Sequence, residues 1–211
     1  MLLEPTESAR LILVRHPQLA DPGRDLALGR RDAELSRRGE QQVVELMRTL
    51  APLQIDEVLT SPAQHCRRSA EALAKDRGLE PGVIEALHDQ DLGTWSGKRW
   101  DEIKLSDEAL LREFFADYGL VAPPEGESLT VAVDRALEWW SDKAPTCQEK
   151  TLLLVLSAPL LSGFAARLLG LSLRRALSLS LPAAGLGILD VFRDGAAIRT
   201  WHPNALREDM P

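Results

Sequence analysis

An Arg-His pair at the end of an apolar segment is the part of this sequence best suited to phosphate chemistry. Four apolar residues at positions 11–14 precede Arg15 and His16, and Pro17 follows them. An apolar run of this kind is typical of a buried strand, and proline disfavours a helical conformation at the residue before it. We therefore expect the strand to end near His16, at the edge of a sheet where α/β proteins bind ligands. An Arg-His pair at the start of an ordinary surface loop would look the same, so the pair needs support from other motifs.

Strand-like and helix-like segments alternate along the rest of the chain. Strands are expected at positions 57–60, 83–87 and 151–156, followed by a hairpin of 186–192 and 196–201 across an Asp-Gly turn. Helices are expected at 36–50, from Ser61 onward, and at 106–118, 129–144 and 157–170. This alternation predicts an α/β fold, a three-layer α/β/α sandwich with a mostly parallel sheet and helices on both faces. We expect residues 1–211 to form a single domain with a lid-like insertion at about 98–128.

Composition and charge exclude several classes of function. The net charge is −7 and the sequence pI is about 5.2, without a long basic run, which argues against nucleic acid or an anionic membrane as a partner. The apolar stretch at 152–166 contains Pro159 and is too short to span a bilayer. Cys66 and Cys147 lack metal-ligand spacing and suit a reducing compartment, and residues 1–5 do not resemble a secretory signal. The sequence therefore predicts a cytoplasmic protein.

Six short motifs follow one another in a specific order. They are Leu-Val-Arg-His at 13–16, Gly-Arg-Arg-Asp at 29–32 with Leu35, Ser36 and Gly39, Thr-Ser-Pro at 60–62, Gly-Thr-Trp-Ser-Gly at 93–97 continuing to Ile103, Gly-Glu-Ser at 126–128, and Leu-Val-Leu-Ser at 154–157. Together they resemble the histidine phosphatase superfamily, most closely its phosphoglycerate-mutase-like branch near α-ribazole-phosphatase-like proteins. The resemblance runs from about position 11 to 169, and several ordered motifs are much more specific than any one of them.

This resemblance implies a phosphoryl-transfer site. It makes His16 the nucleophile that is phosphorylated, Arg15 a clamp on the phosphoryl oxygens, and Asp89 the acid that protonates the leaving group. Gln18 and Arg30 are further candidate substrate contacts. The implied partner is a small phosphorylated molecule or inorganic phosphate, and the chemistry needs neither a metal nor another cofactor.

The same resemblance reveals substitutions at catalytic positions. The family has a second arginine where this sequence has His65, a second histidine where it has Ala158, and a glutamate where it has Asp89. Removing one preorganised electrostatic group from a catalytic site costs roughly 10²–10³ in rate. We therefore expect a divergent protein that binds phosphate at Arg15 and His16 but is catalytically impaired.

Two alternatives stay open at this point. One is a slow or specialised phosphomonoester hydrolase that works through a phosphohistidine at His16. The other is a metal-dependent enzyme in which His16, His65 and Asp89 hold a divalent ion, because two imidazoles and a carboxylate suit such an ion. The sequence does not identify the physiological ligand, and it leaves a homodimer open.

Overall fold

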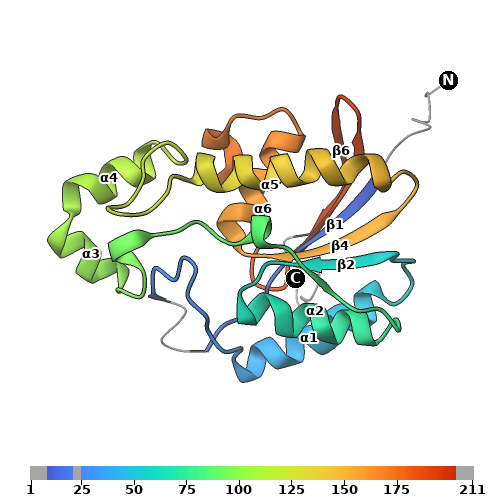
Figure 1. Ribbon diagram of the computed structural model, residues 1–211. Coiled ribbons are helices and arrows are strands. Elements are labelled where there is room, and N and C mark those ends of the chain that lie inside the picture. Colours follow the sequence, from blue (N-terminus) through green and yellow to red (C-terminus); the bar gives the residue numbers. More distant parts are fainter. Residues whose placement is uncertain (1–8, 21–24, 203–211) are drawn as a thin grey trace, which may run out of the picture.

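A six-stranded mixed sheet forms the centre of the computed structural model, which describes residues 9–20 and 25–202 (Figure 1). The strands are β1 (Ala9–Arg15), β2 (Glu57–Thr60), β3 (Gly82–Val83), β4 (Thr151–Leu156), β5 (Leu186–Phe192) and β6 (Gly195–His202), in the spatial order β3-β2-β4-β1-β5-β6. The strands β3, β2, β4 and β1 run parallel, whereas β5 and β6 form the antiparallel hairpin. The mostly parallel sheet is thus confirmed. The N-terminal positions on which the leader prediction rests lie outside the described residues.

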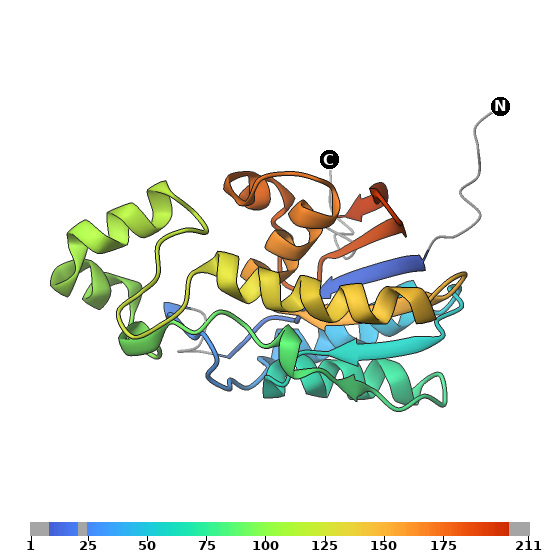
Figure 2. The same cartoon turned by 45° about the horizontal axis from the view of Figure 1, so that its top comes forward.

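Helices cover both faces of the sheet (Figure 2). One face packs against α1 (Arg37–Leu50) and α2 (Gln64–Lys75), and the other against α5 (Leu129–Lys143), α6 (Ala158–Leu168) and the 3₁₀ helix η5 (Leu173–Leu179). Strand β1 shows why two apolar layers form, since its side chains alternate between faces. Ile12 and Val14 join the core under α1 and α2, while Leu11 and Leu13 join the core under α5 and α6. The predicted three-layer sandwich is therefore confirmed.

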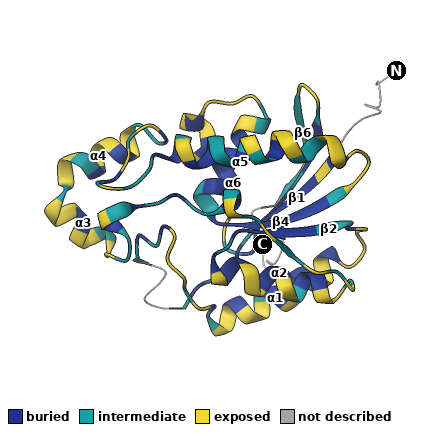
Figure 3. Ribbon diagram, viewed as in Figure 1, coloured by how far each residue is buried: buried dark blue, intermediate teal, exposed yellow. Residues whose placement is uncertain are grey.

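Two short helices lie beyond the end of the sheet, α3 (Trp100–Ser106) and α4 (Glu108–Ala116), and much of their outer surface is exposed (Figure 3). The sequence predicted one helix at 106–118, which is wrong. Asp107 interrupts the helix with φ −133° and ψ 37°, and its carboxylate accepts a hydrogen bond of 3.1 Å from Trp95 Nε1. The two helices pack around the fully buried Trp95 in a small core of their own.

Some element boundaries lie where the sequence predicts them, and others are shifted by a few residues. Ser36 caps α1 by accepting a hydrogen bond of 2.9 Å from the Gly39 amide, as expected for a serine at this position. Helix α2 begins at Gln64, three residues later than Ser61. The strand expected at 83–87 is also shorter, because β3 ends at Val83 and the 3₁₀ turn η2 (Glu85–Leu87) follows. In the part of the chain that the structure describes, no helix has the length and apolar character needed to cross a membrane.

Candidate active site

A cavity of about 420 Å³ opens at the carboxyl ends of β1 and β4. This is the position at which open α/β sheets bind ligands. The residues singled out from the sequence that line it are Arg15, His16, Gln18, His65, Asp89 and Ala158, joined by Ser157. Four segments distant in the sequence thus meet here: the end of β1, the first turn of α2, the loop after η2 and the first turn of α6.

His16 is held by both its backbone and its ring. Its amide donates to the Leu156 carbonyl at 3.0 Å, continuing the pairing of β1 with β4. Its Nδ1 lies 2.8 Å from the carbonyl oxygen of Pro17. Because a carbonyl only accepts hydrogen bonds, Nδ1 carries the proton and Nε2 keeps a free lone pair. Burial, together with the neighbouring His65, lowers the pKa of His16 to about 3, so the ring is neutral at physiological pH.

Arg15 brings a guanidinium to the same cavity. Its Nη1 donates to the Leu181 carbonyl at 2.7 Å, which fixes one side of the group. Its Nε is buried and has no hydrogen-bond partner among the described residues. Burial lowers the pKa of Arg15 from its usual value, and the charge of Asp89 acts in the opposite sense. An arginine stays charged throughout the physiological range, so Arg15 places a positive charge beside the cavity.

His65 packs edge-on against His16, with ring centroids 4.6 Å apart and ring planes at 70°. It is the second residue of α2 and is only 3% exposed. Burial lowers its pKa to about 4, so His65 is neutral at pH 7. Its Nδ1 is buried without a hydrogen-bond partner in the described chain. The position at which the resemblance implies a fixed cation therefore holds an uncharged ring.

The start of α6 supplies a hydroxyl and a methyl group. Ser157 precedes the first residue of the helix and is 5% exposed, and its hydroxyl caps no amide but lies close enough to Asp89 to lower the pKa of that carboxyl group. Ala158 is the first helical residue and lines the cavity without offering a polar group. The side chains of Arg15, His65 and Ser157 nevertheless line the same cavity, and their polar groups suit it to a polar ligand.

Asp89 is the carboxylic acid of the cavity. Desolvation raises its pKa to about 6, while the nearby Ser157 hydroxyl and the amide of Gln90 act in the opposite sense. The Gln90 amide donates to Asp89 Oδ1 at 2.8 Å. A carboxyl group with a pKa near 6 is protonated in a useful fraction of molecules close to neutral pH, which is a property required of a general acid.

Glu127 holds the loop that carries Asp89, a role that the sequence did not indicate. Its Oε1 accepts from Arg135 Nη2 at 2.9 Å, from Arg30 Nη2 at 2.8 Å and from the Asp91 amide at 3.0 Å. Arg135 Nη1 in turn donates to the carbonyls of Ala86 and His88 at 3.0 and 3.2 Å. The loop is thus fixed on both sides of Asp89. The Gly-Glu-Ser motif was visible in the sequence, but no pattern pointed to Arg135.

Two glycines allow this loop to approach its neighbour. Gly93 has φ +50°, and a Cβ there would lie 2.1 Å from the Pro124 carbonyl oxygen. A Cβ on Gly126 would lie 2.5 Å from the Asp91 carbonyl oxygen. Both distances are shorter than contacts between such atoms permit. The glycines of these two motifs therefore serve to bring the Asp89 loop and the Glu127 loop together.

The two additional substrate contacts suggested from the sequence lie in different settings. Gln18 lines the cavity, and its Oε1 accepts a hydrogen bond of 2.9 Å from the Ser36 hydroxyl at the start of α1. Arg30 pairs with Glu127, and its Nε donates to the Asp89 carbonyl at 3.2 Å. Arg30 thus stabilises the acid loop in this structure, and its contact with a bound phosphate stays a prediction.

The histidine phosphatase superfamily (branch 1) model matches residues 11–204 of this chain. The chain belongs to this superfamily. Curated relatives are similar over parts of their length. A 2,3-bisphosphoglycerate-dependent phosphoglycerate mutase from Bartonella quintana is 30% identical over 125 residues, 56% of this chain and 60% of that protein. A glucosyl-3-phosphoglycerate phosphatase from Mycolicibacterium vanbaalenii is 27% identical over 169 residues, 77% of this chain and 75% of that protein. The match to the mutase thus spans less than two thirds of that relative.

Solved structures show the same superfamily fold. A putative α-ribazole-5'-P phosphatase from Escherichia coli superposes with a TM-score of 0.84 at 21% identity, covering 92% of this chain and 96% of that one. A mycobacterial glucosyl-3-phosphoglycerate phosphatase in complex with inorganic phosphate superposes with a TM-score of 0.82 at 23% identity, covering 93% and 98%. The family and the phosphoglycerate-mutase-like fold expected from the motifs are therefore confirmed.

The metal-ion alternative finds no support in the geometry of this site. Among residues 9–20 and 25–202, no group of three histidine, cysteine, aspartate or glutamate side chains could hold a metal ion. His16 and His65 are close, but Nδ1 of His16 is engaged with Pro17. The residues therefore do not fit the divalent-ion site proposed from the sequence.

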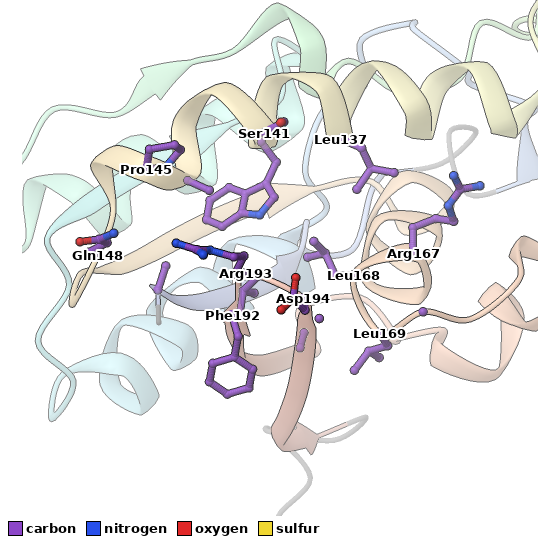
Figure 4. A pocket seen from close by; sticks show the side chains of 17 residues that line it. Leu137, Ser141, Pro145, Gln148, Arg167, Leu168, Leu169, Phe192, Arg193 and Asp194 are labelled. Carbon is purple, nitrogen blue, oxygen red and sulfur yellow. The ribbon is translucent and has the colours of Figure 1, made fainter. Parts of the chain in front are cut away.

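A larger cavity, of about 750 Å³, lies at the opposite end of the sheet (Figure 4). It is formed by the ends of α5 and α6 and by the β5–β6 turn, and it contains Arg167, Arg193 and Asp194. No histidine or cysteine lines it within the described residues. The smaller cavity, not the larger one, therefore holds the groups that phosphoryl transfer requires.

Proposed function

We propose that this protein hydrolyses phosphomonoesters through a phosphohistidine on Nε2 of His16, at a rate reduced by the loss of two phosphate-binding side chains. The observation that carries the proposal is the state of His16. Its ring is neutral, Nδ1 is anchored to the Pro17 carbonyl, and it lines the same cavity as Arg15 and Asp89. A nucleophile, a fixed cation and an acid are the minimum set for this chemistry.

The first step forms the phosphoenzyme. The Nε2 lone pair of His16 attacks phosphorus, an N–P bond forms, and the ester P–O bond breaks. The departing alkoxide takes the proton of the Asp89 carboxyl group and leaves as the alcohol. Nδ1 of His16 keeps its proton throughout, and the Pro17 carbonyl stabilises the positive charge that the ring acquires.

The second step returns the enzyme to its starting state. Water attacks phosphorus while the Asp89 carboxylate accepts a proton from it, and the N–P bond breaks. Inorganic phosphate leaves, His16 is again neutral, and Asp89 is again protonated. During both steps Arg15 stabilises the charge on the equatorial oxygens, with the Ser157 hydroxyl as a further donor.

The reduced rate follows from the side of the cavity formed by α2 and α6. His65 is neutral and Ala158 has no donor, so Arg15 is the one guanidinium among the described lining residues. Two other arginines of α2 do not replace the missing cation, because Arg68 is paired with Glu34 and Arg67 lies 3.8 Å from Glu71. Each absent group accounts for roughly 10²–10³ in rate, although groups that act together are not additive.

Binding of phosphate without turnover is the second candidate function. The substitutions at His65 and Ala158 favour it, since both remove groups that stabilise a transition state. In either case we propose a small phosphorylated molecule or inorganic phosphate as the partner and the cytoplasm as the location. Neither nucleic acid nor membrane is part of this proposal, and a homodimer stays a prediction from the sequence.

Steady-state hydrolysis of phenyl phosphate separates the two candidates. We expect turnover in the wild-type protein, none in His16→Ala, and strongly reduced turnover in Arg15→Ala. Arg67→Ala is the matched control, since Arg67 is exposed on α2 and does not line the cavity, and its turnover should equal that of the wild type. Saturable phosphate binding in calorimetry together with no turnover above the His16→Ala baseline would establish the binding protein instead.

A further inference from the structure

We propose that the alcohol part of the substrate is apolar and carries no second anionic group, as in aryl or alkyl phosphomonoesters. This inference rests on the proposed phosphomonoesterase function and names the substrate class of the same site. It follows from the composition of the cavity wall beyond the phosphate-binding end and from the charges around it.

The wall beyond His16 is built from large apolar side chains. Leu26, Leu28 and Trp100 line the cavity and are partly exposed, so a ligand can reach them. Pro159, after Ala158, adds a further apolar surface from the start of α6. Hydroxyl groups of a sugar placed against these side chains would lose water without gaining hydrogen bonds, which is unfavourable.

This wall is a built feature of the fold. The Ala27 amide donates to the Lys98 carbonyl at 2.9 Å, and the Gly97 amide donates to the Ala27 carbonyl at 2.7 Å. These bonds pair the segment that carries Leu26 with the segment that leads into α3. Trp100 in turn packs on Phe115 of α4, with ring centroids 5.6 Å apart. The apolar side chains are therefore held in place by pairing between two loops and by the α3–α4 core.

Two of the arginines near this wall are paired with carboxylates, and a third lies against the backbone. Arg30 is bound by Glu127, and Arg99 Nε lies 3.2 Å from Asp101 Oδ1. The Arg31 guanidinium lies against the backbone of Gly97, where a Cβ would be 2.2 Å from it. None of these three arginines is among the described residues that line the cavity. Among the described residues that line the cavity, Arg15 at the phosphate-binding end is the one arginine or lysine, so a second carboxylate or phosphate on the substrate would meet apolar side chains of this wall.

The cavity volume is compatible with such a ligand. About 420 Å³ lies in the range of small-molecule sites, which combine mostly apolar walls with a few placed polar groups. Here the polar lining side chains are Arg15, His16, Gln18, His65, Asp89 and Ser157. The phosphoryl group would occupy that end, and the alcohol group would occupy the wall of Leu26, Leu28 and Trp100.

A matched pair of esters tests the inference. Phenyl phosphate and 4-carboxyphenyl phosphate have similar leaving groups and differ by one carboxylate. We expect kcat/KM for phenyl phosphate to exceed that for 4-carboxyphenyl phosphate by at least about 10²-fold, since burying an unpaired charge is costly and apolar pockets reject even neutral polar groups by about that factor. Equal kcat/KM values, or a preference for the carboxylate, would overturn the inference.

A variant of the wall sharpens this test. Leu26→Lys places a cation beside the alcohol group. It should lower the ratio of kcat/KM for phenyl phosphate to kcat/KM for 4-carboxyphenyl phosphate by roughly tenfold or more, because the carboxylate then has a cationic partner. Leu177→Lys is the control, since Leu177 is an exposed leucine on η5, outside the cavity, and its ratio should equal that of the wild type. An unchanged ratio in Leu26→Lys would show that the alcohol group does not contact this wall.

Inert analogues keep the two proposals separate. Phenylphosphonate and 4-carboxyphenylphosphonate cannot be hydrolysed, and calorimetry gives their Kd values without any turnover. If no ester is hydrolysed, the proposed function fails. Tighter binding of phenylphosphonate than of 4-carboxyphenylphosphonate would then still support a preference for ligands with an apolar group and no second anion. If both esters are hydrolysed but the carboxylate is not disfavoured, the function stands and this inference fails.

Discussion

The two sides of the cavity differ in how completely they are equipped for phosphoryl transfer. On the β1 side, His16 is anchored through Nδ1 and Arg15 through Nη1, and a carboxyl group with a raised pKa completes the set. On the side formed by the first turns of α2 and α6, a neutral His65 and Ala158 stand where the resemblance implies an arginine and a histidine. One side keeps the reacting groups, and the other has lost cationic contacts.

If the proposed function is correct, this difference predicts which contribution to catalysis is reduced. The nucleophile and the acid determine whether the phosphohistidine can form, whereas the groups on α2 and α6 determine how strongly the transition-state charge is stabilised. A protein with the first set and without the second should form the same intermediate more slowly. The predictions below restore or remove groups on each side of the cavity and measure the effect on catalysis.

Restoring both family residues should give the largest change. We expect His65→Arg combined with Ala158→His to raise kcat/KM for phenyl phosphate by roughly 10³–10⁴, because each residue supplies a missing donor to the phosphoryl group. Each single variant should give a smaller gain. Steady-state kinetics checks this, and a double variant that folds as the wild type does but stays at wild-type activity would show that other features limit the rate.

Removing the acid should give the next largest effect. We expect Asp89→Asn to lower kcat/KM by roughly 10³, the usual contribution of a general acid. In the wild type, kcat/KM should rise with pH near pH 3, because His16 (pKa about 3) loses its proton and becomes nucleophilic. It should fall above about pH 6, because Asp89 (pKa about 6) loses the proton that it donates to the leaving group. The falling limb should weaken in Asp89→Asn. The second ionisation of the substrate affects both proteins equally, so an identical falling limb in the two pH profiles would exclude Asp89 as the acid.

Ser157 tests the contribution of the cavity side formed by α2 and α6. Its hydroxyl is the polar side-chain group that lines the cavity at the start of α6, so if it contacts the phosphoryl group, Ser157→Ala should lower kcat/KM by roughly 10² and weaken inorganic phosphate binding. Ser162, also on α6 but bound to the Leu179 carbonyl at 3.4 Å, offers a control in Ser162→Ala. Equal activity in the Ser157→Ala variant and the wild type would mean that this hydroxyl does not contact the phosphoryl group.

The elements of the fold could be predicted from local patterns in the sequence, whereas the grouping of distant residues at one site was implied by the family resemblance of the ordered motifs. The apolar strand before Arg15 and the capping serine at position 36 each determine their own element through side chains close in sequence. The break at Asp107 could not be predicted, since it depends on a hydrogen bond to Trp95. The state of His65 also depends on burial by distant segments, which lowers its pKa.

The role of Glu127 also depends on residues distant in the sequence and could not be predicted from local patterns. Its substitution should have the smallest effect on activity of those considered. We expect Glu127→Gln to lower the free energy of unfolding by about 1–2 kcal/mol, because Arg135 and Arg30 lose a charged acceptor. Activity should fall by roughly tenfold as the Asp89 loop loosens. Urea unfolding measures the first quantity. Glu113→Gln, on the exposed surface of α4, is the control and should change neither value.

Chemical trapping of the phosphoenzyme shows whether His16 is the nucleophile. The protein is mixed with phenyl [³²P]phosphate, quenched in base on the millisecond scale, and digested so that the labelled peptide can be identified. We expect a base-stable, acid-labile phosphoryl group on His16, bonded to Nε2 and absent in His16→Ala. Turnover of the ester without any label on His16, or a label on another residue, would contradict that role.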